Sequence, residues 1–492
     1  MSARNSSPLR KAGAVMGLLA SVLGAGCVSP VTYVRPADPS QTRYLGPTAG
    51  ATAPVAAAAA DVPRVSLGNT PPEAWWTVLG SEQINRLVSL ALANNQSLAS
   101  AQAHLAAARE RIHAAQGAWY PQLDVTAAAQ RTRYGAPVLG SLAKDFPPYS
   151  AYAAGPAVSY DLDIFGGTRS RVEQAAANAQ YESARLQAAA LSVSGNVVIE
   201  ALQIATLRAQ IRVALGIIAD DERTLALIRG ARDAGAVSDM DVLSAQSQTD
   251  HDRTLLPPLR QDLSVAQDVL SSLVGEAPSD WTAPDVELNE FKLTQDLPVV
   301  LPSELVHRRP DIGAAEAQLH AASAALGLAT ANLYPHLTLS AAIGSQGLLN
   351  GGPSESAFNL LAGLTAPVFH GGTLTAERRA ARDEYQAAFA AYRQTVLEAF
   401  SQVAGSLQAL TNDADSLSAQ QHALQSASAS LSLTRQAYAA GKAGYVQVLD
   451  AQRLDQQAQL GEVQANGQRF TDVVKLLLAA GGRVDPASID RP

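Results

Sequence analysis

The sequence contains a single cysteine, Cys27, among its 492 residues. One thiol excludes an intramolecular disulfide, a zinc site built on several cysteines and an iron–sulfur cluster held by the chain's own cysteines. Aromatic residues make up only 5% of the chain and charged residues only 16%, whereas hydrophobic residues reach 47%. The apolar content is therefore mostly small and aliphatic, which suits closely packed helices better than an aromatic globular core.

Basic charge is also scarce, since 36 Lys and Arg face 44 Asp and Glu and leave a formal net charge of −8. A general nucleic-acid binder needs a basic face that neutralises phosphates, so the composition argues against one. The eight histidines are scattered without metal-ligand spacing, and no phosphate-binding loop or Gly-x-Ser-x-Gly motif occurs. We therefore predict that the protein is not an enzyme.

The start of the chain is typical of an exported lipoprotein. Three basic residues precede an apolar run over 12–25, which is short for a membrane-spanning helix, and Cys27 follows two places later. This order predicts a signal peptide over residues 1–26. The letters LGAGC at 23–27 resemble a lipobox, although Gly24 stands where a bulky apolar residue is usual.

In this interpretation Cys27 becomes the mature N-terminus and carries a diacylglycerol and an N-acyl chain, which anchor the protein firmly to a membrane. Val28 follows, so the aspartate that retains a lipoprotein in the inner membrane is absent, and sorting to the outer membrane of a Gram-negative bacterium is implied. An ordinary signal peptide with a coincidental cysteine is the alternative. Residues 27–72, rich in Pro, Ala, Thr and Gly, indicate a lipidated, extended tether.

The rest of the chain repeats itself. Residues 101–128 and 315–342 share 11 of 28 positions, and residues 231–246 and 437–452 share 7 of 16, in the same order and at nearly constant offsets. Such self-similarity is the signature of tandem units. We predict two copies of one unit, over 73–300 and over 301–492, with a linker or small cap at the end of the first and a C-terminal tail after the second.

Each copy predicts the same order of elements. An alanine-rich helix leads to two strands, a very long helix, a turn centred on Gly235 or Gly441, and a return helix, which Pro257-Pro258 interrupts in the first copy. The expected helices before the turns span about 80–118, 168–233, 310–332 and 374–439. Apolar residues three and four apart predict a coiled-coil seam along the long helices, which Asp221 breaks in the first copy.

Apolar and polar residues alternate over about ten positions in the expected strands, as around Val158, Leu339 and Leu360. This pattern is typical of barrel strands with apolar side chains outward, although soluble hairpins alternate in the same way. No later stretch holds 18 strongly hydrophobic, uncharged residues, so we predict no transmembrane helix. Four strands cannot close a barrel, so either the strands lie outside a membrane or several chains share one barrel.

Four segments resemble the TolC-like outer-membrane efflux family, and its NodT/OprM-like lipoprotein branch in particular. They are LPSELVHRRPDIGAAEAQLHAASAALGLATANLYPHLTLSAAIG (301–344), SYDLDIFGGTRS (159–170), APVFHGGTL (366–374) and RQAYAAGKAGYVQVLDAQR (435–453). The resemblance implies a mainly helical fold with β structure, in which a homotrimer forms a long α-helical coiled-coil barrel and one shared transmembrane β-barrel. It also implies a periplasmic adaptor (membrane fusion) protein and an inner-membrane pump of the resistance-nodulation-division type as partners.

The resemblance further implies a periplasmic gate at the hairpin tips. Asp450 matches a pore-lining acid, Val446 an apolar ring one turn earlier, and Arg453 a basic residue one turn later. Tyr438 matches a tip tyrosine that can hydrogen-bond an acid on the neighbouring hairpin, here Asp241. An ordinary solvated helix face is the alternative for these acids.

Two tip residues depart from the pattern of some members of the family. Gln447 stands in place of a second acid, and Ala443 in place of a locking arginine, for which Lys442 is a candidate substitute. Three functions stay open: an efflux channel for drugs or small solutes, a duct for type I protein secretion, and a periplasmic coiled-coil lipoprotein without a pore. The lipid anchor and the RRPDI motif favour the first over the second, and dependence of the purified protein on detergent would separate both from the third.

Overall fold

The computed structural model describes residues 32–45, 64–133, 148–293, 296–349 and 351–484, and Cys27 with its signal peptide lies outside them. The chain divides into two compact units. Unit 1 comprises residues 1–35, 107–180 and 317–390, and unit 2 comprises residues 36–106, 181–316 and 391–492. The long helices α5 (Gly167–Asp233) and α10 (Thr373–Ala439) contribute to both units. Both agree with the predicted long helices to within one residue.

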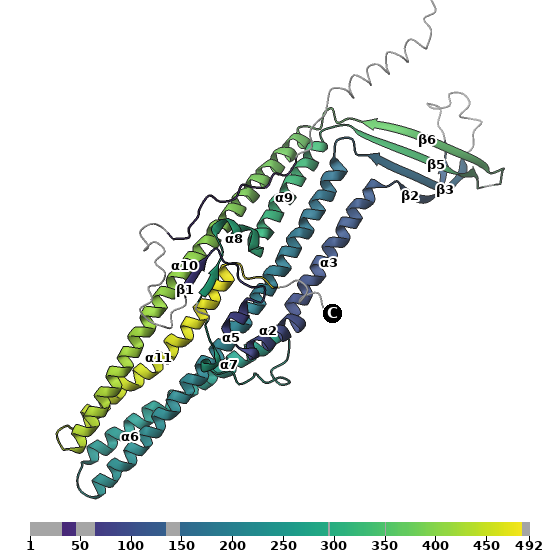
Figure 1. Cartoon of the computed structure of the whole chain (residues 1–492). Helices are drawn as coiled ribbons and strands as arrows, with labels where there is room; N and C mark the ends of the chain where they lie inside the picture. The colour runs from purple at the N-terminus through teal and green to yellow at the C-terminus, as the bar shows by residue number, and fades with distance from the viewer. Residues whose placement is uncertain (1–31, 46–63, 134–147, 294–295, 350, 485–492) are drawn as a thin grey trace, which may run out of the picture. The chain divides into compact units, whose positions relative to one another are not determined.

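Unit 1 contains one antiparallel sheet, whose four strands lie side by side in the order β2-β3-β5-β6 (Figure 1). The strands are β2 (Gln122–Thr132), β3 (Tyr149–Leu162), β5 (His336–Leu348) and β6 (Glu355–Thr365). Each sequence repeat supplies one hairpin, and pairing of β3 with β5 joins the two. Parts of α3 (Gln96–Gln116), α5, α9 (Pro310–Ala331) and α10 complete the unit.

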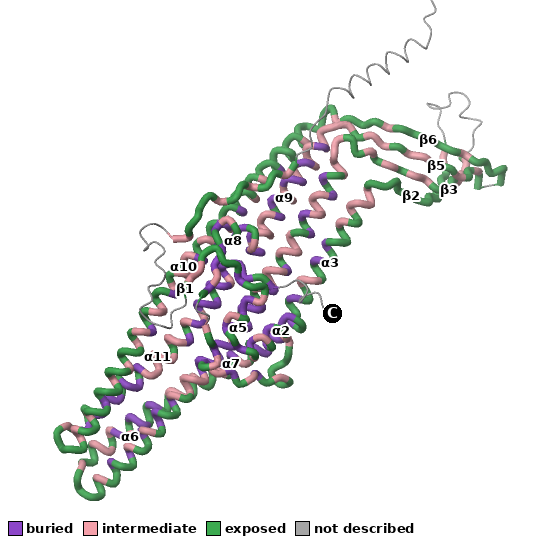
Figure 2. The backbone as a smooth tube through the Cα atoms, in the orientation of Figure 1, coloured by how far each residue is buried: buried purple, intermediate pink, exposed green. Residues whose placement is uncertain are grey.

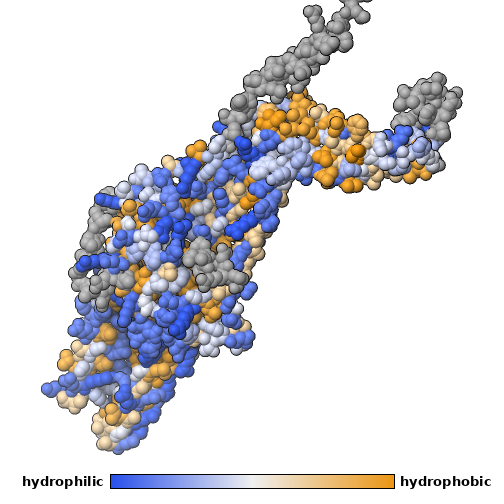
Figure 3. Space-filling view, turned by 45° about the vertical axis from the view of Figure 1, so that its right-hand side comes forward, coloured by the Kyte–Doolittle hydropathy of each residue, from blue (hydrophilic) through white to orange (hydrophobic). Residues whose placement is uncertain are grey.

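The pairing register gives this sheet one apolar face. Leu123 lies opposite Val158, Val158 opposite Ala341, and Ala341 opposite Leu360. Because side chains alternate between the two faces, the same face carries Val125, Tyr160, Leu339, Ile343, Phe358 and Leu364. On the other face the Thr338 hydroxyl donates a hydrogen bond of 2.6 Å to Asp161. Hydrophobic side chains accordingly gather over the strands in Figure 3.

Unit 2 is mainly helical and holds most of the core, which Figure 2 shows as buried stretches on its helices. Its elements are α2 (Glu82–Asn94), α6 (Asp239–Arg253), α7 (Leu256–Val274), α8 (Pro302–Arg308), α11 (Tyr445–Ala479), the strands β1 (Arg64–Leu67) and β4 (Asp296–Val299), and parts of the helices shared with unit 1. Trp75, which begins a short 3-10 helix, is fully buried, and its Nε1 donates a hydrogen bond to Ser194 Oγ of α5.

The two short strands β1 and β4 lie in segments where the sequence predicted no strand, and they pair with each other. β1 falls within the predicted tether and β4 within the predicted linker between the repeats, and the two strands run parallel. Part of the tether is also fixed to the helices. In unit 1 Tyr33 stacks on His320, with ring centroids 4.3 Å apart, and in unit 2 the Tyr44 hydroxyl donates to the Val300 carbonyl over 2.8 Å. The tether therefore contributes to the fold.

The first alanine-rich helix differs from the prediction, because α2 and α3 are separate helices. Asn95 divides them: its Oδ1 accepts the amides of Ser97 (3.0 Å) and Leu98 (3.3 Å) and caps α3, while its Nδ2 donates to the Leu273 carbonyl. The predicted interruption at Pro257-Pro258 is confirmed, since α6 ends at Arg253 and α7 begins at Leu256 with proline in its first turn.

Among the described helices, α5 contains an 18-residue window that is long and apolar enough to cross a membrane, where the sequence predicted none. Of that window, 56% is buried inside the chain. Val197, Val198 and Leu202 of α5 are fully buried. A core helix is hydrophobic on most of its surface, so packing within the bundle accounts for this composition.

Candidate functional site

The two helical hairpins of unit 2 end in turns of the same construction. Gly235 and Gly441 follow α5 and α10 with φ of 73° and 68°, left-handed values that cost a residue with a side chain about 1–2 kcal/mol. The amide of each glycine donates to the carbonyl three residues earlier, Arg232 (2.8 Å) and Tyr438 (2.9 Å). The next amide reaches back five residues, which makes both turns Schellman motifs.

The helices that leave these turns begin differently. Ser238 caps α6: its Oγ accepts the Asp241 amide (3.3 Å), and Asp241 Oδ2 accepts the Ser238 amide (3.1 Å) in return. α11 begins after Gly444, which has no side chain to act as a cap, and Gln447 occupies the position equivalent to Asp241. Glycine in place of a capping serine costs a helix start only roughly a few tenths of a kcal/mol. The second tip is therefore held slightly more weakly at this point.

Three of the predicted gate residues lie together in the first turns of α11. Val446 is 60% exposed and the Asp450 side chain 66% exposed, so both are accessible in the single chain, as a pore-lining role requires. Arg453 Nη1 lies 3.7 Å from Asp450 Oδ1. An exposed ion pair of this kind contributes about 0–1 kcal/mol to stability. The charge of Asp450 is therefore compensated in part by a residue of its own helix.

Tyr438 and Asp241 come near each other without bonding in the single chain. Tyr438 packs at the edge of an apolar cluster, with its ring centroid 5.8 Å from that of Tyr445. Burial, and then the charge of Asp241, raise the pKa of Tyr438 above its usual value, so its hydroxyl stays a donor. Asp241 Oδ2 is occupied by Ser238, and no hydrogen bond joins Asp241 to Tyr438 in the described residues. A Tyr438–Asp241 hydrogen bond between adjacent hairpins stays a prediction.

The apolar cluster beneath the tips joins the two hairpins. It consists of Leu225 and Ile228 of α5, Ala245 of α6, Leu431 of α10, and Tyr445, Val448, Leu449 and Ala451 of α11. Since it draws on all four helices, a change in the spacing of the tips requires these side chains to repack.

A buried polar layer, which sequence analysis did not identify as functional, adjoins this cluster. Its members are Asp221 of α5, Gln248 and Asp252 of α6, and Gln452 and Gln456 of α11, all buried. The Gln452 amide donates to Asp221 Oδ1, and the amides of Gln248 and Gln456 both donate to Asp252 Oδ2, over 2.8 and 3.1 Å. The one signal in the sequence was the acidic residue at position 221 in an apolar seam.

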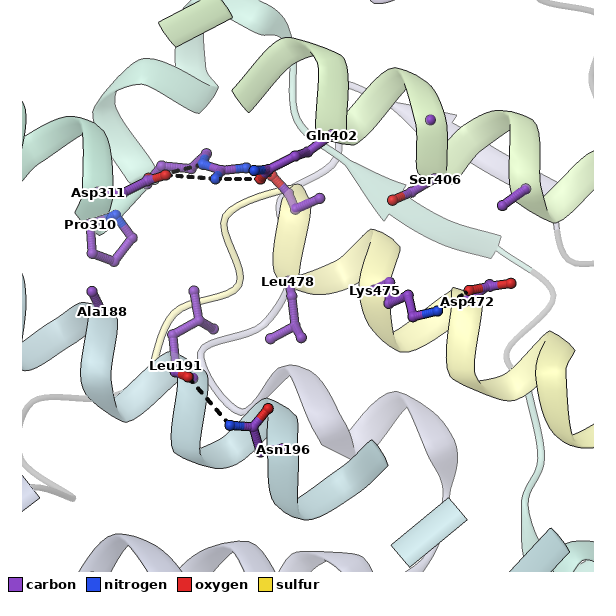
Figure 4. A pocket seen from close by; sticks show the side chains of 15 residues that line it. Ala188, Leu191, Asn196, Pro310, Asp311, Gln402, Ser406, Asp472, Lys475 and Leu478 are labelled. Carbon is purple, nitrogen blue, oxygen red and sulfur yellow. Dashed lines mark hydrogen bonds and ion pairs between the residues drawn. The ribbon is translucent and has the colours of Figure 1, made fainter. Parts of the chain in front are cut away.

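The RRPDI motif forms a joint where α11 ends and α9 begins. Arg309 is buried and donates two hydrogen bonds to the Asp311 carboxylate, one from Nε (3.0 Å) and one from Nη2 (2.7 Å). Its Nη1 donates to the carbonyl of Ala479, the last residue of α11, and its Nη2 also donates to Gln402 of α10. Figure 4 shows the part of this network that runs from Asp311 to Gln402, along one edge of a pocket. One guanidinium thus ties three helices together, which explains the use of arginine here.

The pocket beside this joint lies among α5, α10 and α11 and has a volume of about 720 Å³. Leu191 forms part of its wall (Figure 4). Two charged pairs line it, Arg309–Asp311 and Lys475–Asp472, the latter at 2.8 Å. Both pairs are already satisfied, so the pocket presents no free charge to a ligand. Among the residues that the structure describes, no group of three His, Cys, Asp or Glu is placed to hold a metal ion.

Comparison with known proteins accounts for this arrangement. A family model described as "Outer membrane efflux protein" matches residues 87–276 and 301–482, one segment in each repeat, so the tandem organisation is confirmed. The pyoverdine export outer membrane protein OpmQ of Pseudomonas aeruginosa is 31% identical over 460 residues, which cover 91% of each chain. A probable outer membrane lipoprotein of Salmonella typhimurium, SilC, is 27% identical over 416 residues, or 83% of this chain and 87% of its own.

A solved structure extends the likeness to three dimensions. The outer-membrane channel OprN superimposes with a TM-score of 0.83 at 25% sequence identity, over 92% of this chain and 99% of its own. The predicted fold, with long helices, paired antiparallel strands and two repeats, is thereby confirmed.

Proposed function

Because the chain belongs to the outer membrane efflux protein family, and is thus an outer-membrane channel and not an enzyme, we propose that three copies form the exit duct of a tripartite efflux pump. The observation that carries the proposal is the sheet of unit 1, with its four strands and one apolar face. A closed barrel needs about eight or more strands, and lipid does not tolerate the open edges of β2 and β6. Several such sheets side by side can close a barrel and leave no edge. Two sheets already supply eight strands, so the choice of three copies, with twelve strands, comes from the resemblance to the TolC-like family.

The proposed duct carries drugs or small solutes delivered by an inner-membrane pump of the resistance-nodulation-division type through a periplasmic adaptor. Export of pyoverdine, named for the relative OpmQ, supports a small-molecule cargo over a secreted protein. The periplasmic gate is formed by Val446 and Asp450, three copies of each, at the second hairpin tips. An apolar ring beside an acidic ring keeps the resting conductance low and favours cations.

Acylation of Cys27 is part of this proposal. The lipobox-like segment before Cys27 supports it, as does the description of the relative SilC as a probable outer membrane lipoprotein. The acyl chains then add to the attachment that the apolar face of the sheet provides.

Mass measurement of the detergent-solubilised protein tests the assembly, and single-channel recording in planar bilayers tests the pore. We expect a trimer that conducts poorly at rest and prefers cations. A monomer in several detergents, without conductance at any voltage, contradicts the proposal and leaves a periplasmic coiled-coil lipoprotein as the alternative.

A further inference from the structure

Two acidic side chains are buried against each other near the gate. Asp221 of α5 is 4% exposed and Asp252 of α6 is 3% exposed, and they lie close enough for Asp252 to raise the pKa of Asp221. Two ionised carboxylates in this position repel each other and are both deprived of water. A single proton shared between them removes the repulsion.

The hydrogen bonds around the pair show where that proton belongs. Asp252 Oδ2 accepts two amide hydrogen bonds, from Gln248 and Gln456, so its negative charge is well supported. Asp221 accepts one, from Gln452 to Oδ1. Asp221 Oδ2 is buried and, in the described part of the chain, has no partner. A proton on this oxygen neutralises Asp221, removes its repulsion with Asp252 and turns an unpartnered acceptor into a donor, in a position where a charge is costly to bury.

We propose that Asp221 and Asp252 form a proton-binding site that, while it holds one proton, keeps α5, α6 and α11 closed behind the periplasmic gate. The protonated Asp221 joins α5 to α6 through Asp252, and Gln452 and Gln456 attach α11 to both. Release of the proton leaves two negative charges in contact, and separation of the helices relieves them. The role in gating rests on the proposed function, whereas the proton site does not.

A series of side chains connects this site to the gate acid. Gln248, which donates to Asp252, accepts a hydrogen bond of 3.2 Å from Nε of Arg453. Arg453 is in turn the ionic partner of Asp450, at 3.7 Å. A shift of α6 against α11 therefore displaces the residue that compensates the charge of Asp450. α6 and α11 lie in contact, as expected for such coupling (Figure 1).

The other charged or titratable groups near the pair come from three helices. On α5, Asp220 lies beside Asp221 and forms an ion pair with Arg223. On α6, Arg253 forms ion pairs with Glu222 and Asp250. On α11 the groups are Tyr445, Arg453 and Asp455, and Asp455 accepts a hydrogen bond from Ser428 of α10. None of these bases pairs with Asp221 or Asp252 in the described residues. Burial first, and then the hydrogen bond and charge of Asp252, raise the pKa of Asp221 from 3.8 to about 8.

The direction of the pH effect follows from this shift. The folded, closed state holds a proton that an exposed or unfolded Asp221 releases near its ordinary pKa, so closure is favoured at low pH. That advantage declines as the pH rises, and it is lost above about 8. Asp413 also has a raised pKa, of about 6, caused by burial and by Asp472. Between about pH 6.5 and about pH 9.5 Asp413 is mostly ionised, and comparison with Asp221→Asn identifies the part of the pH response that comes from Asp221.

The test uses the full-length protein and the variant Asp221→Asn, whose amide mimics the protonated acid. Infrared difference spectra against wild type should show a protonated carboxyl band at about pH 6.5 that disappears towards about pH 9.5. Asp252→Asn should move this titration to lower pH, because it removes the neighbouring charge. Over the same range the resting open probability of wild type should rise. If the open state lowers the pKa of the site by one unit, the total rise should be about tenfold, and each further unit should multiply it by about ten. Asp221→Asn should stay closed. The control Asp220→Asn should keep the pH response, with its midpoint only slightly lower, because Asp220 is the smallest of the causes that raise the pKa of Asp221.

Each outcome decides a separate point. Absence of a titrating band that Asp221→Asn removes overturns the proton site. A band together with an unchanged pH response in Asp221→Asn overturns its role in gating. If no form of the protein conducts, the proposed function fails, and hydrogen exchange of α6 and α11 then decides whether the proton holds the helices. If the amide hydrogens of α6 and α11 exchange equally fast in wild type and in Asp221→Asn at about pH 9.5, the proton does not hold these helices together.

Discussion

Asp450 has a basic partner on its own helix, and this partner determines how the gate should respond to mutation. Removal of the carboxylate in Asp450→Ala leaves Arg453 without its ionic partner, so the local charge becomes more positive. We expect the cation-to-anion permeability ratio to fall about two- to tenfold. Reversal potentials measured under a salt gradient in planar bilayers give this ratio directly.

A matched control separates this local effect from net charge. Asp239→Ala removes the same charge from the first tip, where Asp239 lies 3.4 Å from Arg232. It should leave the permeability ratio unchanged. An equal fall in both variants would show that selectivity follows the overall charge of the tips, and Asp450 would then belong to a solvated helix face.

At the same scale, the sequence reveals which residues are unusual but not which ones meet. Asp221 is visible as the acid that breaks an apolar seam on α5. Its partner, Asp252, lies on another helix among other polar residues, where nothing in the sequence distinguishes it. Which two acids come together depends on the rotation of both helices, and this is set by packing of the whole bundle. The buried pair is therefore evident only in three dimensions.

At the scale of elements, the two hairpin tips differ in how firmly their return helices begin, and Tyr438 lies at the weaker tip. Tyr438→Phe removes a hydroxyl that we predict to hydrogen-bond Asp241 of an adjacent hairpin. A net hydrogen bond is worth about 1 kcal/mol, so its loss should shift the closed-to-open ratio about fivefold for each bond. Single-channel recording should show a higher resting conductance.

Tyr445→Phe is the control, because it removes a similar hydroxyl from the tyrosine that packs against Tyr438. It should leave the resting conductance as in wild type. Asp241→Ala is a less specific variant, since it also breaks the capping box with Ser238 and weakens the start of α6. An equal rise in Tyr438→Phe and Tyr445→Phe would indicate general loosening of the apolar cluster and would argue against the bond.

The elements themselves follow closely from the sequence, with one informative exception. The long helices have strong start and stop signals: glycine-rich turns precede them, and Gly235 and Gly441 end them. The break at Asn95 carries only a weak signal, because asparagine is a preferred helix cap but does not by itself end a helix. Its side chain also donates to the Leu273 carbonyl, far along the chain, which helps to fix the break at this position. Long-range contacts of this kind are absent from local patterns.

At the scale of the whole molecule, the repeat and the count of strands are enough to predict an assembly from the sequence. Four strands with an apolar face are incomplete in lipid, because the backbone groups at the two open edges have no hydrogen-bond partners there. The parallel pairing of β1 with β4 was not predictable, because each strand has only four residues. Pairing between strands so far apart in the chain is decided by the surrounding core.

Two separate features should hold the assembled protein in the outer membrane, the acyl chains on Cys27 and the apolar face of the sheet. Cys27→Ser should lose the acyl mass but stay largely in the membrane fraction and retain part of its efflux activity, because the sheet still inserts. Leu360→Arg tests the sheet, since Leu360 is 75% exposed on the apolar face and arginine there costs about 2–4 kcal/mol near the bilayer centre. Asn359→Arg, on the opposite face, is its control.

Mass spectrometry and membrane fractionation after an alkaline wash distinguish the two contributions. We expect Leu360→Arg to reduce the membrane-bound trimer far more than Asn359→Arg does, and the combination with Cys27→Ser to release most of the protein. Complete release of Cys27→Ser alone, with Leu360→Arg still retained, would mean that lipid alone anchors the chain. The apolar face of the sheet would then lie outside the bilayer, and its open edges would no longer require a barrel shared between copies.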